Sequence, residues 1–175
     1  MKHRLFVVFF LSMFVFALPV GAAQLKLGFV NIQKALNSSQ AGQDAKAKIA
    51  QKAKEYEAEF VLKRKELKDF GENLKKQMAL LSPEAKRDKE REYQQMVTDF
   101  QRATKDAQAF LKQEDADHTR AIIRELVKII EKIGKQEGYT LVFEKAEGSI
   151  LFADKQIDLT DKVIKDYDKE YKTGK

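Results

Sequence analysis

The 175-residue sequence predicts an α+β protein in which a long antiparallel α-helical hairpin, a coiled-coil-like arm, projects from a small β body. Residues 43–133 contain only one glycine, Gly71, and one proline, Pro83, and their apolar residues recur at alternating steps of three and four. Short segments at both ends of the chain alternate apolar and polar residues, as strands do. We therefore expect the arm at residues 43–133 and the body at residues 24–42 and 134–175.

Each limb of the predicted arm carries one apolar stripe, so the limbs are expected to pack on each other. The first limb has a and d positions at Ile49, Ala53, Tyr56, Phe60, Lys63, Leu67, Phe70, Leu74, Met78 and Leu81. The second limb has its stripe at Tyr93, Met96, Phe100, Ala103, Ala107, Phe110, His118, Ile122, Leu126, Ile129 and Ile133.

The tip of the hairpin is expected at residues 81–84. Ser82 can accept hydrogen bonds from free N–H groups of a new helix, and Pro83 suits the first helical position. At a rise of about 1.5 Å per residue, the first limb is about 58 Å long, so it must project from a domain of this size. A projecting arm favours a clamp, a spacer or an oligomer over an enzyme with a buried cleft.

Residues 1–23 have the pattern of a cleavable signal peptide. The basic residues Lys2 and Arg4 precede an apolar run from Leu5 to Leu18, and small residues follow at Gly21 and Ala23. The alternative is an uncleaved membrane anchor, although the run is short for one. Because the chain has no cysteine, an exported form must be stabilised by packing and oligomerisation.

The body is predicted from strands on both sides of the arm. Residues 24–31 alternate as a strand, Gly138 is expected to end the second limb, and residues 139–144 and 149–153 are expected to form a β-hairpin. Asp158 or Thr160 is expected to cap a last helix. The apolar side of that helix is expected to consist of Val163, Ile164, Tyr167 and Tyr171.

Three short strands are too few to bury their faces in one chain, so self-association is expected. Several copies can pool their strands into a small closed body and remove exposed sheet edges. The candidate residues for this contact are Leu27, Phe29, Leu141, Val142, Phe143 and Leu151.

The outer part of the arm, residues 63–91, has ten basic and six acidic residues. Such an excess attracts anionic partners, namely acidic polypeptides, lipid head groups or lipopolysaccharide, unless the charges only solvate exposed helices. Nucleic acid is disfavoured, because no nucleic-acid-binding pattern is present. The candidate cations for steering a partner are Lys63, Arg64, Lys65, Lys68, Lys75, Lys76, Lys86, Arg87, Lys89 and Arg91.

The sequence predicts a non-enzyme that needs no metal and no cofactor. It has no cysteine and two histidines, of which His3 lies in the predicted signal peptide. His118 lies beside Asp115 and Asp117, where a surface imidazole with incidental acidic neighbours is the simpler interpretation than a proton relay. Gly71 is either a bending point of the arm or a tolerated surface glycine.

Five features together resemble the Skp/OmpH family of Gram-negative periplasmic chaperones: the signal peptide, Leu27-Gly28-Phe29-Val30-Asn31, the basic hairpin, residues 137–143 and Ile157-Asp158-Leu159-Thr160-Asp161. The resemblance implies a jellyfish-shaped homotrimer whose helical arms enclose a cavity. It also implies ATP-independent holding of unfolded outer-membrane β-barrel proteins, here called clients, in the periplasm. Lipopolysaccharide binding stays open, and the charged tail at residues 165–175 departs from the family.

The proposed mechanism needs many weak apolar contacts, because unfolded barrel strands aggregate through their edges. The candidate client contacts are Phe60, Phe70, Leu74, Met78 and Leu81, and packing between the limbs is the alternative role of each. The alternative function is an exported coiled-coil scaffold or adaptor of the cell envelope that has no unfolded clients.

Overall fold

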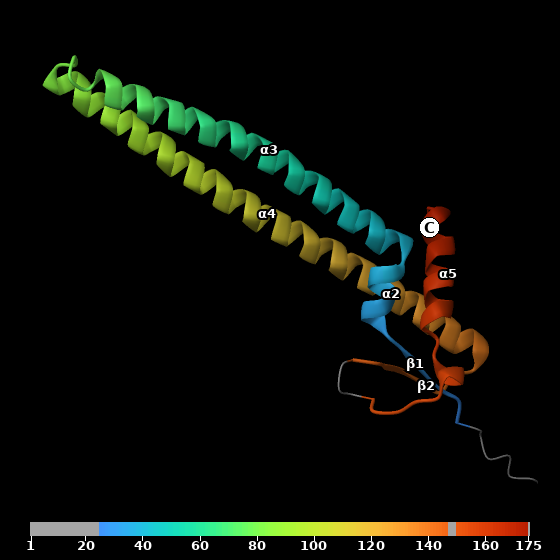
Figure 1. Ribbon diagram of the computed structural model, residues 1–175. Coiled ribbons are helices and arrows are strands. Elements are labelled where there is room, and N and C mark those ends of the chain that lie inside the picture. The colour runs from blue at the N-terminus through green and yellow to red at the C-terminus, as the bar shows by residue number, and fades with distance from the viewer. Residues whose placement is uncertain (1–24, 147–149, 175) are drawn as a thin grey trace, which may run out of the picture.

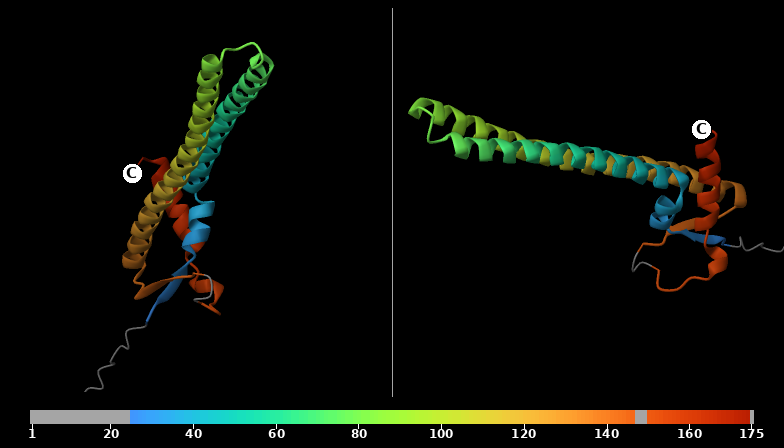
Figure 2. Two further views of the ribbon diagram at one scale, coloured as in Figure 1. Left: turned by 90° about the vertical axis from the view of Figure 1, so that its left-hand side faces the viewer. Right: turned by 45° about the horizontal axis from the view of Figure 1, so that its top comes forward.

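The computed structural model describes residues 25–146 and 150–174, so the predicted signal peptide lies outside the described residues. The chain is a long two-helix arm that leaves a small body at one end (Figure 1). The two arm helices run side by side in every view (Figure 2). The body holds the remaining helices and a two-stranded sheet. The predicted class, a mostly helical α+β fold with a small sheet, is confirmed.

The arm consists of α3 (Gln40–Gln77) and α4 (Pro83–Glu137). Its tip has the predicted chemistry: Ser82 is the N-cap of α4, its hydroxyl accepts a hydrogen bond from the Ala85 N–H at 3.2 Å, and Pro83 is the first helical residue. At the other end, α4 stops at Gly138, whose φ of 70° is the left-handed conformation that glycine adopts readily. With 55 residues, α4 is about 82 Å long.

The seam between α3 and α4 follows the predicted stripe of the first limb from Ile49 to Leu74, whose eight residues are half-buried. Met78 and Leu81 are also half-buried, but α3 ends at Gln77, so the first limb is shorter than the predicted one and these two residues belong to the tip. The second limb differs at one position. Phe110 still meets Tyr56 of α3 edge-to-face, with ring centroids 6.3 Å apart, but it is 44% exposed. The more buried positions here are Ala107, Leu111 and Glu114. The buried positions advance by four residues from Ala107 to Leu111 and then by three to Glu114, whereas the sequence analysis advanced by three to Phe110. Apolar spacing alone did not distinguish these two orders of steps.

A short helix that the sequence analysis did not predict, α2 (Ile32–Ser38), precedes the arm. Asn31 caps α2 by accepting a hydrogen bond from the Lys34 N–H at 2.7 Å. Ser39 then breaks the helix and caps α3, its hydroxyl accepting from the Gly42 N–H at 3.2 Å. The available signal for α2 in the sequence was the pair of N-cap residues Asn31 and Ser39, which are eight residues apart.

The sheet is parallel: β1 (Leu27–Val30) pairs with β2 (Leu141–Glu144), with Leu27 opposite Leu141 and Phe29 opposite Phe143. The predicted β-hairpin is wrong where it can be judged, because residues 150–153 form no strand and Ser149 lies outside the described residues. Leu151 and Phe152 are 97% and 89% exposed, so no layer of the same chain covers them. Residues 155–158 return to β1 instead, where Phe29 bridges to Asp158.

The core lies where the body meets the inner end of α4. Buried side chains of α4 at Ile122, Leu126, Ile129 and Ile133 pack with residues of β1, α2 and α5 (Thr160–Lys172). Leu159, rather than Asp158 or Thr160, holds the cap position of α5, and the Asp158 carboxylate accepts from the Thr160 N–H at 2.9 Å. The predicted apolar side of α5 is confirmed for Val163, Ile164 and Tyr167, whereas Tyr171 is 40% exposed.

Candidate functional site

The arm is the candidate site. Three of its five apolar candidates, Phe60, Phe70 and Leu74, lie on α3 in the seam, and Met78 and Leu81 lie in the turn at the tip. Phe60 meets Phe100 edge-to-face with ring centroids 5.9 Å apart, and Phe70 stacks on Tyr93 at 6.1 Å. Such pairs contribute about 0.5–1.5 kcal/mol beyond the area they bury. The remaining candidates are also half-buried: Leu74, Met78 and Leu81. These residues therefore hold the limbs together, and only their outer atoms can touch a partner.

Gly71 lies against the ring of Tyr93. A β-carbon at Gly71 would be 3.3 Å from Tyr93 Cε2, so the absence of a side chain lets the ring lie flat against α3. The stacked Phe70 beside it completes this contact. The geometry gives Gly71 a packing role that neither of the two sequence interpretations included.

Apolar residues outside the seam offer a more accessible contact surface. Leu80 at the tip is 88% exposed, and Val61 and Leu62 on α3 are 54% and 64% exposed. Sequence reasoning missed them because they fall between heptad positions. The usable signal was a pair of adjacent aliphatic residues on the outer face of a charged helix, although isolated exposed aliphatic residues are common.

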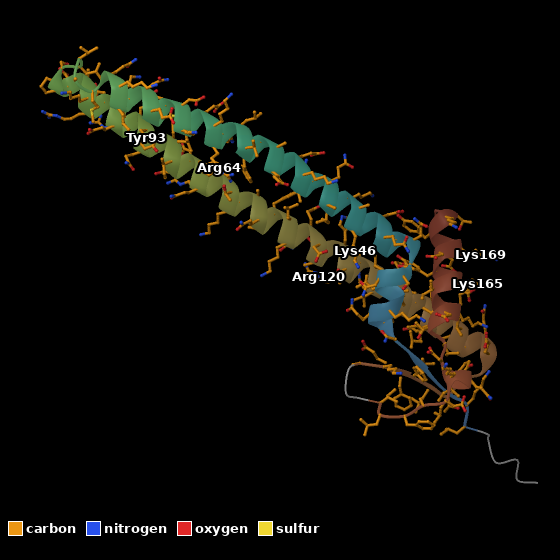
Figure 3. All side chains as sticks on the ribbon, viewed as in Figure 1. Lys46, Arg64, Tyr93, Arg120, Lys165 and Lys169 are labelled. Carbon is orange, nitrogen blue, oxygen red and sulfur yellow. The ribbon has the colours of Figure 1, made fainter. Side chains whose placement is uncertain are left out.

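The ten predicted cations are half-buried or exposed. Figure 3 shows the side chains along both limbs, with Arg64 labelled on α3. Lys63 is half-buried beside the seam and pairs with Glu59 at 2.7 Å, and Lys89 pairs with Glu92 at 2.7 Å. Lys68 and Arg91 have looser acidic partners at 3.9 and 3.8 Å. Six of these ten cations have no acidic partner within 4.0 Å among the described residues: Arg64, Lys65, Lys75, Lys76, Lys86 and Arg87.

The six candidates for self-association divide into two groups. Phe29 is 3% exposed and Val142 packs against the core, so both stabilise the chain itself. Leu141 and Phe143 are 51% and 50% exposed, Leu151 is 97% exposed, and Leu27 is half-buried. The exposed members, all after the arm in the sequence, are apolar side chains of the body that another chain can reach.

His118 lies where the arm joins the body, with Nε2 4.0 Å from the Glu114 carboxylate. Hydrogen bonds from Gln113 and Arg120 lower the pKa of neighbouring Asp117, so that carboxylate stays charged. Within the described residues, no group of three or more His, Cys, Asp or Glu side chains can hold a metal ion. No helix in the described part of the chain is long and apolar enough to cross a membrane.

Comparisons with known proteins cover most of the chain. Residues 26–167 match the family described as "Outer membrane protein (OmpH-like)". A protein of Aquifex aeolicus (strain VF5), described as uncharacterized, is 26% identical over 145 residues, which is 83% of this chain and 87% of that protein. A crystal structure from Caulobacter crescentus CB15, described as a candidate outer membrane chaperone (OmpH-like), is similar at a TM-score of 0.78 and 17% identity. The similarity covers 86% of this chain and 88% of that one, and it shows the fold.

Proposed function

Because this chain belongs to the OmpH-like family of outer membrane proteins, we propose that it is an ATP-independent holdase chaperone that binds unfolded outer-membrane proteins and prevents their aggregation. One observation carries the proposal: a long hairpin projects from the body and presents unpaired cations and exposed aliphatic residues along its outer half. The proposed location is the periplasm of a Gram-negative bacterium, reached through a cleavable signal peptide. The protein is proposed to be a non-enzyme without cofactor or metal.

The working particle is proposed to be a homotrimer joined through its bodies. The exposed side chains of Leu141, Phe143 and Leu151, together with Phe152, support this, because a single chain leaves them in water. Three arms from one body would surround a cavity, and a client would touch several arms at once. Avidity then gives firm retention from contacts that are individually weak.

The arm is proposed to act on a client in two ways. Cations near the tip attract an acidic client or an anionic surface, including lipopolysaccharide, over a distance set by the ionic strength. Aliphatic residues then hold an unfolded segment by contact, with Leu80, Val61 and Leu62 the most accessible and the outer atoms of the seam residues contributing less. A client bound in this way stays mobile, because no contact is specific.

The competing function is an envelope scaffold or adaptor with one folded partner, and a mixing experiment separates the two. A urea-unfolded outer-membrane barrel protein is diluted into buffer with or without the mature chain, and aggregation is followed by light scattering. A holdase suppresses scattering at about one trimer per client. The mass of the complex, measured by sedimentation, then equals the mass of one trimer plus the mass of one client.

A matched variant makes the test specific for the arm. Phe70 lies opposite Tyr93, so deleting residues 68–95 and joining the limbs by a short turn removes almost equal lengths of both helices. The shortened chain should keep the body and the oligomer but lose most of its holding activity, because it lacks Leu80 and most of the outer cations while Val61 and Leu62 remain. Scattering that the parent chain does not reduce, or that the shortened chain reduces equally well, contradicts the proposed function.

A further inference from the structure

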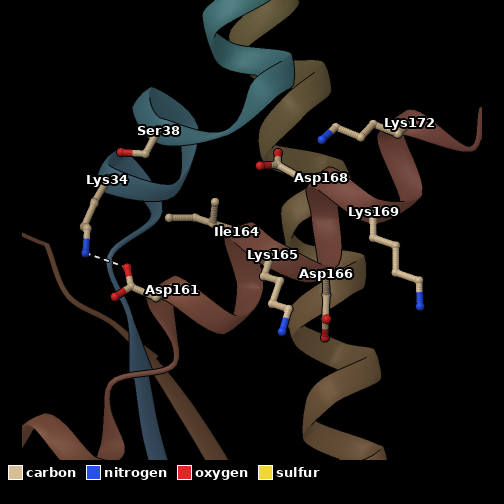
Figure 4. A pocket seen from close by; sticks show the side chains of 9 residues that line it. All are labelled: Lys34, Ser38, Asp161, Ile164, Lys165, Asp166, Asp168, Lys169 and Lys172. Carbon is tan, nitrogen blue, oxygen red and sulfur yellow. Dashed lines mark hydrogen bonds and ion pairs between the residues drawn. The ribbon is translucent and has the colours of Figure 1, made fainter.

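Residues 165–172 of the charged tail belong to α5, and α5 crosses the root of the arm, where the arm meets the body (Figure 1). Its buried face, with Val163 at 0% exposure and Tyr167 at 6%, belongs to the same core as Leu126 and Ile129 of α4. It also contacts α2, β1 and the start of α3. Figure 4 shows the ion pair, 2.7 Å long, between Lys34 of α2 and Asp161 of α5. α5 therefore connects the start of α3 to the end of α4.

At the start of α3, α5 supplies a second cap in addition to the Ser39 hydroxyl. The first turn of α3 contains no acidic residue. Asp168 of α5 accepts a hydrogen bond from the Gln40 N–H at 2.8 Å, so a carboxylate from another helix satisfies one free N–H group and complements the positive end of the helix dipole. A second hydrogen bond joins the side chains of α5 and α3: the Tyr171 hydroxyl donates to Asp44 Oδ2 at 3.1 Å. Asp44 Oδ1 accepts from Gln40 Nε2 at 2.9 Å.

On the side of α4, Glu170 of α5 accepts from Lys132 Nζ at 2.7 Å, and Lys162 of α5 pairs with Glu137. The bond with Glu170 raises the pKa of Lys132. Both limbs of the arm are thus attached to one short helix, α5. About 39 residues of α4 lie between Ile122 and the tip, a lever of about 59 Å, so a change of 5° at the root moves the tip by about 5 Å.

We propose that α5 is the positioning element of the arm: through Asp168 and Tyr171 it fixes the first turn of α3 against the body, and so it sets the direction and the stiffness of the arm. The match to the family ends at residue 167, and the two residues that make these bonds, Asp168 and Tyr171, lie beyond it. The functional consequence rests on the proposed holdase activity, because it concerns the size of the space between arms.

The test uses substitutions that remove one bond each. Asp168→Ala removes the cap, Asp168→Asn keeps an oxygen that can accept from Gln40, and Tyr171→Phe removes only the hydroxyl. Hydrogen exchange of residues 39–48 measures opening of the root, and a spin-label pair measures the arm. Because the chain has no cysteine, the double variant Gln77→Cys, Lys155→Cys is labelled only at the tip and in the body. Mixing it with an excess of unlabelled chain leaves at most one labelled chain in each particle, so the measured distances lie within one chain.

A lost cap is expected to speed exchange of the first turn of α3 about fivefold in Asp168→Ala. Tyr171→Phe is expected to give a smaller increase, and Asp168→Asn should stay within about twofold of the parent. The distribution of tip-to-body distances should broaden in the same order. Unchanged exchange and unchanged distances in Asp168→Ala overturn the proposal. If that variant does not fold, Tyr171→Phe decides alone, and parental exchange and distances in it overturn the proposal equally.

Neither measurement needs a client, so the two proposals fail separately. A root that loosens as expected in a protein that holds no clients supports the positioning role and contradicts the holdase. A parent that holds clients and an Asp168→Ala variant with a parental root contradict the positioning role alone.

Discussion

Replacing Gly42 by alanine tests whether the corner between α2 and α3 is as tight as the structure indicates. Gly42 is the third residue of α3, and the Leu36 carbonyl at the end of α2 lies directly against it. A β-carbon at this position would be 1.8 Å from Leu36 O and 3.0 Å from the Leu36 carbonyl carbon. Since the obstacle is backbone, a side-chain rotation cannot relieve the clash, and α2 must move by more than about 1 Å.

The expected cost combines three effects. Overpacking of a tight contact costs about 1–3 kcal/mol. Movement of the corner also weakens the cap that Ser39 provides to the Gly42 N–H, which is typically worth about 1 kcal/mol. Alanine returns about 1 kcal/mol through its higher helix propensity. The net loss is about 2 kcal/mol, which lowers Tm by about 4–8 °C in a chain of this length.

Gly134→Ala is the matched control, because Gly134 is also helical but nothing lies within 4 Å of its β-carbon position. It should gain up to about 1 kcal/mol from helix propensity alone. Thermal unfolding of parent and variants is followed by circular dichroism at one fixed protein concentration, since an oligomer's Tm depends on concentration. The reasoning is refuted if Gly42→Ala is as stable as the parent or gains stability as Gly134→Ala does.

Three further predictions concern the outer charges, the body surface and a buried phenol. Reversing the charge of four outer cations should slow capture of an acidic unfolded client at low salt, as measured by stopped-flow fluorescence. The slowing should disappear at 1 M salt, where the Debye length is about 3 Å. An equal slowing on reversal of four lysines nearer the root would exclude an effect specific to the outer cations. The outer set is Lys75, Lys76, Arg87 and Lys89, and the control set is Lys48, Lys54, Lys105 and Lys112. Leu141→Asp should separate the proposed trimer in sedimentation velocity while the chain stays folded, whereas Phe29→Asp should lower Tm of the chain itself; a trimer that survives Leu141→Asp would exclude this surface. Burial raises the pKa of Tyr167 from 10.0 to about 12, so the folded chain favours the neutral phenol, and the stability that this gives below pH 10 is lost as pH rises toward 12. Tyr167→Phe should lose less stability over that range in urea titrations, and an identical decline in both proteins would contradict the assignment.

The sequence by itself determined the features that depend on local repetition and on the chemistry of single positions. A three-and-four step fixed which face of residues 49–81 meets the other limb, because a helix turns by a nearly constant angle per residue. Ser82 with Pro83, and Gly138, fixed the two ends of α4, because capping needs only the hydroxyl, the ring or the positive φ of the residue itself. The excess of cations at residues 63–91 was likewise visible as composition.

Tertiary structure alone decided which segments meet and what each candidate residue touches. The pairing of β1 with β2 joins residues 114 positions apart, and no local pattern distinguishes it from the hairpin that the sequence favoured. Gly42 is ordinary in the sequence, and a side chain at this position is costly only because the Leu36 carbonyl lies against it in the folded chain. Asp168 reads as one charge in a solvated tail, and it caps the arm because folding carries it to the Gln40 N–H. Local rules describe a residue and its neighbours in the chain, whereas these contacts depend on the relative placement of whole helices, which the packing of the core sets.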